Sequence, residues 1–258
     1  MTTNPSQRPL VLCCSGHDPT GGAGIHADIE AVAANGGHAL SLITAHTVQD
    51  TQDVVRVSAV APILLAAQIE TLLADCSIAA LKIGLLGDTQ QIPVLCSAIA
   101  QTKVPVVLDP ILRAGGGASL TSAALQAATL EHLLPQVTVL TPNAAEARRL
   151  TRRDSLDDCG KALLAMGVPH VLITGGDEPG AVVTNHWYSA NSSHRFEWPR
   201  LSDSFHGAGC TLASAISALL ARGLPMAQAL EDAQRYTFES LSRAFRSGQG
   251  RKIPGRLA

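Results

Sequence analysis

The chain has 258 residues, of which 46% are hydrophobic, 16% charged and 3% aromatic, and its formal net charge is -2 at pH 7. This composition excludes global disorder, and the absence of a basic stripe argues against a nucleic-acid partner. Residues 1–9 lack a signal-peptide core, no apolar run is long enough to span a membrane, and the six cysteines form no CxxC pair. We therefore expect a cytoplasmic protein without membrane association, a disulfide framework or a structural zinc site.

Short apolar runs and stretches of helical spacing alternate along the chain. In chain order they predict a strand at 10–14, a helix at 25–33, strands at 39–44 and 54–57, a helix at 63–73, a strand at 80–85, a helix at 92–100, a strand at 104–108, a helix at 123–133 and a strand at 137–140. The pattern continues with helices at 144–150 and 156–166, a strand at 170–174, a hairpin at 181–187 and 194–198, and helices at 208–221 and 226–245.

This alternation favours βαβ units and an α/β fold, a mainly parallel central sheet with helices on both faces. We expect a single domain over residues 1–258, with irregular tails at 1–8 and 247–258. Ligands bind outside the carboxyl ends of the strands in such sheets. The polar segments that follow strands should therefore gather at one edge of the sheet.

The first such segment is SGHDPTGGAG at residues 15–24, between the first strand and the first helix. It is not a P-loop, because no Gly-Lys-Ser/Thr ends it, and it lacks the G-x-G-x-x-G spacing of a dinucleotide site. Its glycines would let a ligand approach the backbone closely. A tight turn without a ligand fits the spacing equally well.

The second segment is HGAGCT at residues 206–211, which opens a long apolar helix. Glycines before a helix start let backbone N–H groups converge on an anion, such as a transferred phosphoryl group, and the helix dipole adds positive charge. Cys210 lies in this first turn, where we expect a lowered thiol pKa and a thiolate able to take a proton from a substrate hydroxyl. The alternative is a glycine-kinked helix start with a buried cysteine.

Three further polar segments follow predicted strands. Asn143 and Glu146 point the same way on a first helical turn, so they can hold water around Mg²⁺ or form a capping box. Asp109 at a strand end would serve a metal or a structural turn. The Thr-Gly-Gly at residues 174–176 suits either a nucleotide phosphate or a plain turn. The histidines at positions 17, 38, 46 and 206 are better explained as surface or hydrogen-bonded side chains than as metal ligands.

Taken together and in order, seven segments of residues 10–223 resemble the hydroxymethylpyrimidine and phosphomethylpyrimidine kinases of thiamine biosynthesis, within the ribokinase-like superfamily. The segments are SGHDPTGGAGIHADI, SLITAHTVQDTQ, LKIGLLGD, VLDPILRAGGGASL, LTPNAAEA, VLITGGD and HGAGCTLASAISALLARG. No single segment is specific to the family, and the resemblance depends on all seven occurring in the family's order. The resemblance implies a ribokinase-like fold, ATP and Mg²⁺ as cofactors, and a homodimer.

The resemblance also implies a role for individual residues. The pyrimidine side would comprise Gly16, Gly21, Gly22, Ala23, Gly24, Asp28, Gln49, Leu85 and Ile111. The ATP side would comprise Asn143, Thr174, Gly175 and Gly176, with Asp109 and Glu146 near Mg²⁺. Gly207, Ala208 and Gly209 match the family's anion hole, and Cys210 matches its catalytic cysteine, where the wider superfamily usually carries Asp.

Three positions depart from the family pattern. The family often has Lys where this chain has Thr174 and Gly115, and it usually has Thr where this chain has Phe205. Each change removes an expected phosphate donor, which implies weaker ATP binding or loss of the second phosphorylation; Arg113 is the candidate to supply the missing charge.

The expected reaction is phosphoryl transfer from ATP to 4-amino-5-hydroxymethyl-2-methylpyrimidine, with a possible repeat on the monophosphate. The alternatives are a pyridoxal kinase of the same fold and a catalytically weak pyrimidine-binding protein.

Overall fold

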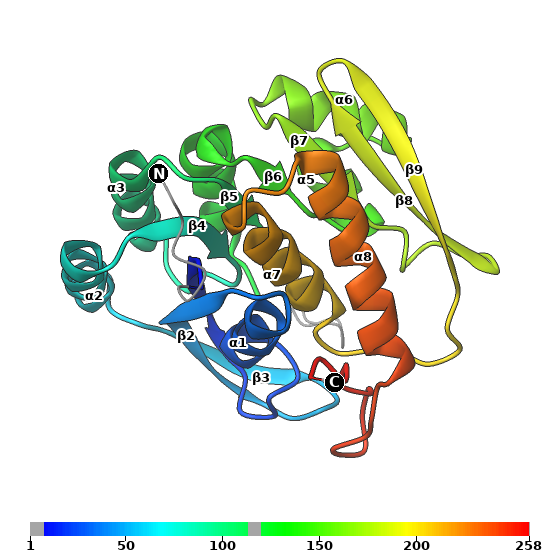
Figure 1. The fold of residues 1–258 in the computed structure, drawn as a ribbon, viewed down its shortest axis with the longest axis horizontal. Coiled ribbons are helices and arrows are strands. Elements are labelled where there is room, and N and C mark those ends of the chain that lie inside the picture. Colours follow the sequence, from blue (N-terminus) through cyan, green and yellow to red (C-terminus); the bar gives the residue numbers. More distant parts are fainter. Residues whose placement is uncertain (1–7, 113–119, 258) are drawn as a thin grey trace.

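A nine-stranded sheet forms the centre of the molecule, in the order β3-β2-β1-β4-β5-β6-β7-β8-β9 (Figure 1). The structure is a computed structural model and describes residues 8–112 and 120–257. The strands are β1 (Leu10–His17), β2 (His38–Gln49), β3 (Val54–Ala59), β4 (Ile78–Ile83), β5 (Val106–Leu108), β6 (Val139–Leu140), β7 (His170–Ile173), β8 (Val182–Ser189) and β9 (Ser192–Pro199). The six from β2 to β7 in this order run parallel, whereas β3, β8 and β9 are antiparallel additions at the edges.

Helices cover both faces of the sheet (Figure 1). Helices α1 (Gly24–Ala34), α7 (Ala208–Ala221) and α8 (Met226–Ser242) pack on one face. Helices α2 (Pro62–Asp75), α3 (Gln91–Thr102), α4 (Ala123–Ala128), α5 (Ala144–Thr151) and α6 (Leu156–Ala165) pack on the other. Alternate residues of β1 divide between the two faces: Leu12 and Cys14 join one core cluster, Val11 and Cys13 the other. This period of two explains why the central strands read as continuous apolar runs.

The predicted α/β class is confirmed, and so is the hairpin, which is β8 paired with β9. Several bounds shift by a few residues, and two elements differ more from the prediction. Strand β2 extends to Gln49 because it pairs with β3 beyond the end of β1, and we call this β2–β3 hairpin the flap. The helix expected at 123–133 changes after α4 into a π-helical turn, Thr129–Leu133, and then a 3-10 turn with Pro135 in its first positions. Proline has no N–H to continue the α-helical ladder.

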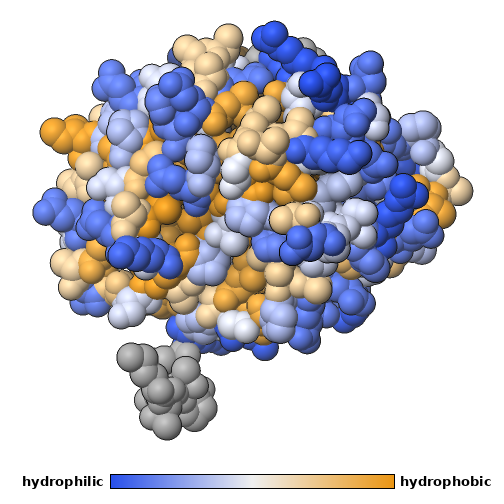
Figure 2. Space-filling view, turned by 90° about the horizontal axis from the view of Figure 1, so that it is seen from above, coloured by the Kyte–Doolittle hydropathy of each residue, from blue (hydrophilic) through white to orange (hydrophobic). Residues whose placement is uncertain are grey.

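The parallel strands bring the predicted site segments to one edge of the sheet. Residues 15–24 leave β1 there, residues 109–112 leave β5, residues 141–146 leave β6 and residues 174–176 leave β7. Among the described residues, no helix is both long enough and apolar enough to cross a membrane. On the face shown in Figure 2, hydrophobic side chains are interleaved with hydrophilic ones.

Candidate active site

The glycine turn, residues 15–24, folds back on itself between β1 and α1. Gly24 begins α1 with a φ of +59°, and a Cβ atom there would overlap the carbonyl oxygen of Gly16. Only glycine meets both requirements without strain. The Asp18 carboxylate closes the turn by accepting a hydrogen bond from the Ala23 backbone N–H at 2.8 Å. The turn is therefore held by its own side chain and has an open backbone.

A second glycine segment begins helix α7. Gly207 is the N-cap with a φ of +88°, and a Cβ atom there would overlap the carbonyl oxygen of Gly22 in the glycine turn. No described side chain caps this helix start. The first N–H groups of a helix have no acceptor within the helix, so those of Ala208, Gly209 and Cys210 suit an anion. Gly209 is exposed, and a Cβ on it would lie 3.5 Å from Oδ2 of Asp109.

A hydrogen bond between two side chains joins the two glycine segments. His206 Nε2 lies 2.8 Å from Asp18 Oδ2, and both side chains are largely buried. Although burial acts to raise the pKa of Asp18, hydrogen bonds from His206 and Thr20 outweigh it and lower the pKa to about 2. His206 was expected to be a surface or hydrogen-bonded histidine, and it is hydrogen-bonded. The sequence reasoning missed Asp18, although an aspartate inside a glycine turn is a recognisable signal for such bonding.

Cys210 lies at the centre of the site and is only 6% exposed. Its thiol lies close to the Asp109 carboxylate and against the backbone N–H of Gly24. Burial raises the pKa of Cys210 to about 12, and Asp109 adds to this, whereas Lys82 acts in the opposite direction. The expected lowering of its pKa is therefore wrong. The helix start and one buried ammonium do not offset the loss of water around the thiolate, so the group is a neutral thiol.

A buried ion pair lies beneath this centre. Lys82 on β4 and Asp28 on α1 are both fully buried, with 2.7 Å between Nζ and Oδ1. Lys82 also donates to Ser15 Oγ at 2.9 Å, and Ser214 on α7 donates to Asp28 at 2.7 Å. Burial acts to lower the pKa of Lys82, but Asp28 and the other nearby acidic groups raise it overall. Asp28, which was expected on the pyrimidine side, is thus a partner in this ion pair. Its contact with a substrate stays a prediction.

Asp109, which is buried, and Glu146, which is half-buried, are neighbouring acidic groups. Burial is the main cause that raises the pKa of Asp109 to about 6 and that of Glu146 to about 8, and the Asp109 charge adds to the shift at Glu146. Glu146 also forms the capping box: its Oε2 accepts from Asn143 N at 3.0 Å, and Asn143 Oδ1 accepts from Glu146 N at 2.8 Å. The capping box, which the sequence offered as one alternative, is therefore present. The other carboxylate oxygen of Glu146, Oε1, accepts a longer hydrogen bond of 3.3 Å from Leu112 N.

These two carboxylates fit the requirements of Mg²⁺. The described residues contain no cluster of three or more His, Cys, Asp or Glu that would hold a metal alone. Mg²⁺ usually binds through one or two carboxylates together with substrate phosphates and water. Two neighbouring carboxylates whose ionisation is suppressed without a cation are a suitable donor set for it.

The predicted nucleotide segment lies beside α5. Thr174 pairs through the backbone with Asn143, the N-cap of α5. Gly175 packs against the backbone of Thr184 on β8, and its N–H donates to the buried Asn185 side chain at 3.0 Å. Gly176 is exposed, with open space on its Cβ side. Asn143 and residues 174–176 are therefore brought together, and the backbone groups of Thr174 and Gly175 and the Gly176 carbonyl are hydrogen-bonded within the protein.

Arg200 is a cation close to Thr174, the position where a lysine was expected. Arg200 donates to the carbonyl oxygens of Gly176 at 2.9 Å and Gly180, and also to that of Glu178, so its guanidinium braces the turn after Thr174. Gly115 and Arg113 lie outside the described residues. Phe205 pairs through its backbone with Lys252, near the C-terminus.

Of the remaining pyrimidine-side residues, Leu85 reaches the glycine turn. Leu85 is buried and contacts Gly16, since a Cβ on that glycine would lie 2.9 Å from Leu85 Cδ2. Ile111 follows Asp109 and is half-buried. Gln49 is half-buried on the flap, where its backbone pairs with Val54, and it lies outside this cluster of described contacts.

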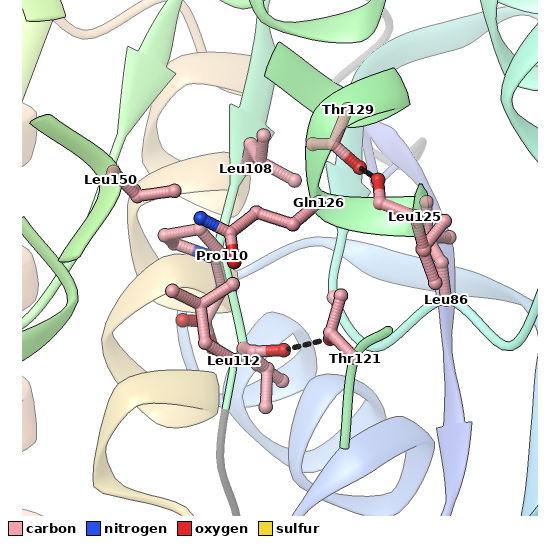
Figure 3. A pocket seen from close by; sticks show the side chains of 12 residues that line it. Leu86, Leu108, Pro110, Leu112, Thr121, Leu125, Gln126, Thr129 and Leu150 are labelled. Atoms are coloured by element: carbon pink, nitrogen blue, oxygen red, sulfur yellow. Dashed lines mark hydrogen bonds between the residues drawn. The ribbon is translucent and has the colours of Figure 1, made fainter. Parts of the chain in front are cut away.

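A small apolar hollow of about 30 Å³ lies under residues 109–112 (Figure 3). Its labelled lining includes Leu86, Leu108, Pro110, Leu112, Thr121, Leu125, Gln126, Thr129 and Leu150. A space of this size holds about one water molecule, too little for a pyrimidine ring. The acceptor site is therefore better sought on the surface between the two glycine segments.

Comparison with known proteins agrees with this arrangement. A family model described as phosphomethylpyrimidine kinase matches residues 18–254. A hydroxymethylpyrimidine/phosphomethylpyrimidine kinase of Synechococcus elongatus is 36% identical over 249 residues, which cover 94% of this chain and 95% of the relative.

Two solved structures are similar over almost the whole fold. An ADP complex of Bacillus subtilis pyridoxal kinase has a TM-score of 0.90 at 25% identity, covering 97% of this chain and 98% of that chain. The phosphomethylpyrimidine kinase of Clostridium difficile has a TM-score of 0.79 at 28% identity, covering 91% of this chain and 100% of that chain.

The raised pKa of Glu146 predicts a pH-dependent stability. Its pKa is 4.5 in an unfolded chain and about 8 in the fold, so between these values the folded state holds a proton that the unfolded state has released. The free energy of unfolding should therefore fall as pH rises through this window, by at most about 1.4 kcal/mol per pH unit. Denaturant unfolding at several pH values should show that Glu146→Gln loses this slope. The matched control is Glu131→Gln, whose side chain is 74% exposed. Parallel curves for wild type and Glu146→Gln would contradict the prediction.

Proposed function

Because the chain belongs to the phosphomethylpyrimidine kinase family, we propose that it transfers phosphate from ATP to the hydroxymethyl group of 4-amino-5-hydroxymethyl-2-methylpyrimidine. The observation that carries the proposal is the contact between the helix-start glycines, Cys210 and the glycine turn. This contact joins the anion site to the glycine turn. The proposal includes one catalytic domain over residues 1–258, in the cytoplasm.

The proposed chemistry is mostly positioning and charge stabilisation, as phosphoryl transfer requires. The N–H groups of residues 207–210 hold the transferred group at the helix start, and residues 174–176 with Asn143 hold the ATP phosphates. Asp109 and Glu146 would hold Mg²⁺, which neutralises phosphate charge when bound.

Cys210 and Asp109 would handle the hydroxyl proton together. The thiol is neutral, with its pKa raised by burial to about 12, and it lies close to a carboxylate whose pKa of about 6 leaves it largely ionised at neutral pH. The substrate hydroxyl gives its proton to Sγ while the thiol proton passes to Asp109. The freed oxygen bonds to the γ-phosphorus as its bond to the ADP oxygen breaks. Because the thiol passes its own proton on as it accepts another, Cys210 and Asp109 can act together as the base without a free thiolate forming first.

A pyridoxal kinase activity is the second candidate. The TM-score of 0.90 with the Bacillus subtilis enzyme exceeds the 0.79 found with the Clostridium difficile pyrimidine kinase. Fold similarity at 25% identity does not set the acceptor, whereas the family match covers residues 18–254. We therefore favour the pyrimidine.

A homodimer is also part of the proposal. The apolar side chains of Val55 on β3 and Ile63 on α2 are each 82% exposed, and they support a partner surface near the flap.

ADP formation with four acceptors tests the proposed function. We expect kcat/KM to be highest for the pyrimidine alcohol, lower for its monophosphate and for pyridoxal, and negligible for ribose. The monophosphate should be the poorer pyrimidine substrate because Thr174 carries no positive charge to offset its phosphate. A preference for pyridoxal would establish the second candidate, and no turnover with any acceptor would favour a binding protein.

Gln49 tests the acceptor side. A carboxamide donates and accepts at once, which matches the edge of an aminopyrimidine. If the flap covers the ring, Gln49→Ala should raise KM for the pyrimidine by about tenfold and leave KM for ATP within about twofold, since one lost hydrogen bond is worth roughly 1.4 kcal/mol. The neighbouring exposed Val48→Ala is the matched control. An unchanged pyrimidine KM in Gln49→Ala would remove this residue from the site.

Cys210 tests the chemical step. Cys210→Ala should lower kcat by about 10²–10⁴ with ATP binding and folding intact, because that is the usual contribution of a proton acceptor. Cys210→Asp should keep part of the activity, since it places a carboxylate at the same point. A thiol reagent should react slowly with Cys210, which is buried and neutral, and faster with the more exposed Cys96, whose Ala variant is the control. Near-normal turnover of Cys210→Ala would refute the assignment.

A further inference from the structure

The C-terminal segment packs against the active-site edge. Residues 248–256, which we call the C-terminal strap, contain no helix, yet Ile253 is 4% and Arg256 only 2% exposed. The irregular tail expected from the sequence thus lacks regular structure but is not a free end. The strap backbone pairs with the segment just before the α7 start: Lys252 N donates to Ser204 O at 3.0 Å, and His206 N donates to Lys252 O at 2.9 Å.

The strap also reaches the tip of the flap. Gly250 N donates to Thr51 Oγ1 at 2.9 Å, and Arg251 N donates to Thr51 O at 3.1 Å. One short segment therefore contacts the flap, the residues before the anion hole and, through Arg256, the glycine turn.

Arg256 ends the strap inside the protein. Its guanidinium donates from Nε to Thr211 Oγ1 at 2.8 Å and from Nη1 to Glu30 Oε2 at 3.0 Å. It also donates to the carbonyl oxygens of Gly21, at 3.4 Å, and Gly22. Thr211 belongs to the first turn of α7, next to Cys210. One side chain thus connects the glycine turn, helix α1 and the start of helix α7.

The Arg256 guanidinium lies at the backbone contact between the two glycine segments. A Cβ on Gly207 would lie 2.8 Å from Arg256 Nη2 as well as overlapping Gly22 O. The guanidinium therefore lies in the joint where the glycine turn meets the anion hole. Its main-chain carbonyl accepts from the Tyr236 hydroxyl on α8 at 3.0 Å, which anchors the residue from its other end.

A guanidinium suits this joint better than other groups. Its side chain is fully buried, and its one carboxylate partner, Glu30, is 39% exposed, so most of its hydrogen bonds go to neutral oxygens. Five N–H groups in a planar fork can serve four acceptors at once, whereas an ammonium has three donors on a flexible stem. Removing the guanidinium would leave the Gly22 carbonyl and the Thr211 hydroxyl without this donor, in a buried place where an unmade bond is costly.

We propose that Arg256 is a positioning residue that sets the distance between the glycine turn and the anion hole, and thereby between the acceptor hydroxyl and the transferred phosphoryl group. The proposal rests on the proposed kinase function, because this distance matters for catalysis only if a phosphoryl group is transferred between the two segments. It extends the active site to the last residues of the chain. Arg256 itself acts through the backbone of Gly22 and the side chain of Thr211, without contact to the substrate.

Steady-state kinetics separate positioning from simple anchoring of the strap. Misplacing reacting groups by about 1 Å can cost about 10²-fold in rate, so Arg256→Ala should lower kcat by about 10- to 100-fold while KM for ATP stays within about twofold. Arg256→Lys should recover only part of the rate, and guanidine added to Arg256→Ala should recover more than ammonium does. The matched control is Lys252→Ala, which removes the strap's surface ion pair with Asp203, 2.7 Å long, and should leave kcat within about twofold.

Hydrogen exchange on the free protein gives a readout that needs no activity. In Arg256→Ala, the amides at residues 20–24 and that of Thr211, which donates to Gly207 O, should exchange faster, while those of β1 and β4 remain as in wild type. If Arg256→Ala does not fold, Arg256→Lys should show the same local pattern in weaker form. If the wild type turned over no acceptor, the proposed function would be refuted. The exchange pattern would still show whether Arg256 holds the two glycine segments in place. Unchanged exchange at both segments, uniformly faster exchange, or a Lys252→Ala defect equal to that of Arg256→Ala would overturn the proposal.

Discussion

The backbone contact between Gly22 and Gly207 is the constraint on which the active-site edge depends. There is no room for a side chain at Gly207, whose φ of +88° and whose closeness to the Gly22 carbonyl oxygen both require glycine. This contact places a turn from the beginning of the chain against a helix start from its end. It brings Cys210 next to Gly24 and Asp109, and it creates the joint that the Asp18–His206 hydrogen bond and Arg256 both hold.

Buried charge around this contact serves organisation more than stability. The Lys82–Asp28 pair is fully buried, and such pairs often contribute little net stability because desolvation offsets their attraction. Breaking either partner, however, would leave an uncompensated charge beneath Cys210. The same surroundings raise the pKa of the Cys210 thiol and those of Asp109 and Glu146, so a cation bound at this edge would favour the ionised form of both carboxylates.

The sequence predicted the fold because apolar runs and helical spacing are local signals, and the parallel sheet with helices on both faces is confirmed. It also indicated both glycine segments. It could not predict the pKa of Cys210, since burial depends on elements far apart in the chain. Lys82 and Arg256 were missed for the same reason: Arg256 meets Gly22 across 234 positions. The roles of Gln49 and Asp28 stay predictions, because their described contacts reach only the flap and the buried ion pair.

A structure of the protein with the pyrimidine alcohol and an unreactive ATP analogue tests the central claim most directly. The account predicts that the acceptor hydroxyl lies within hydrogen-bond distance of Cys210 Sγ, with the ring against the glycine turn and Leu85. It also predicts that the terminal phosphate faces the N–H groups of residues 207–210. A pyrimidine bound elsewhere, or a phosphate bound away from the start of α7, would contradict the assignment of this edge as the phosphoryl-transfer site.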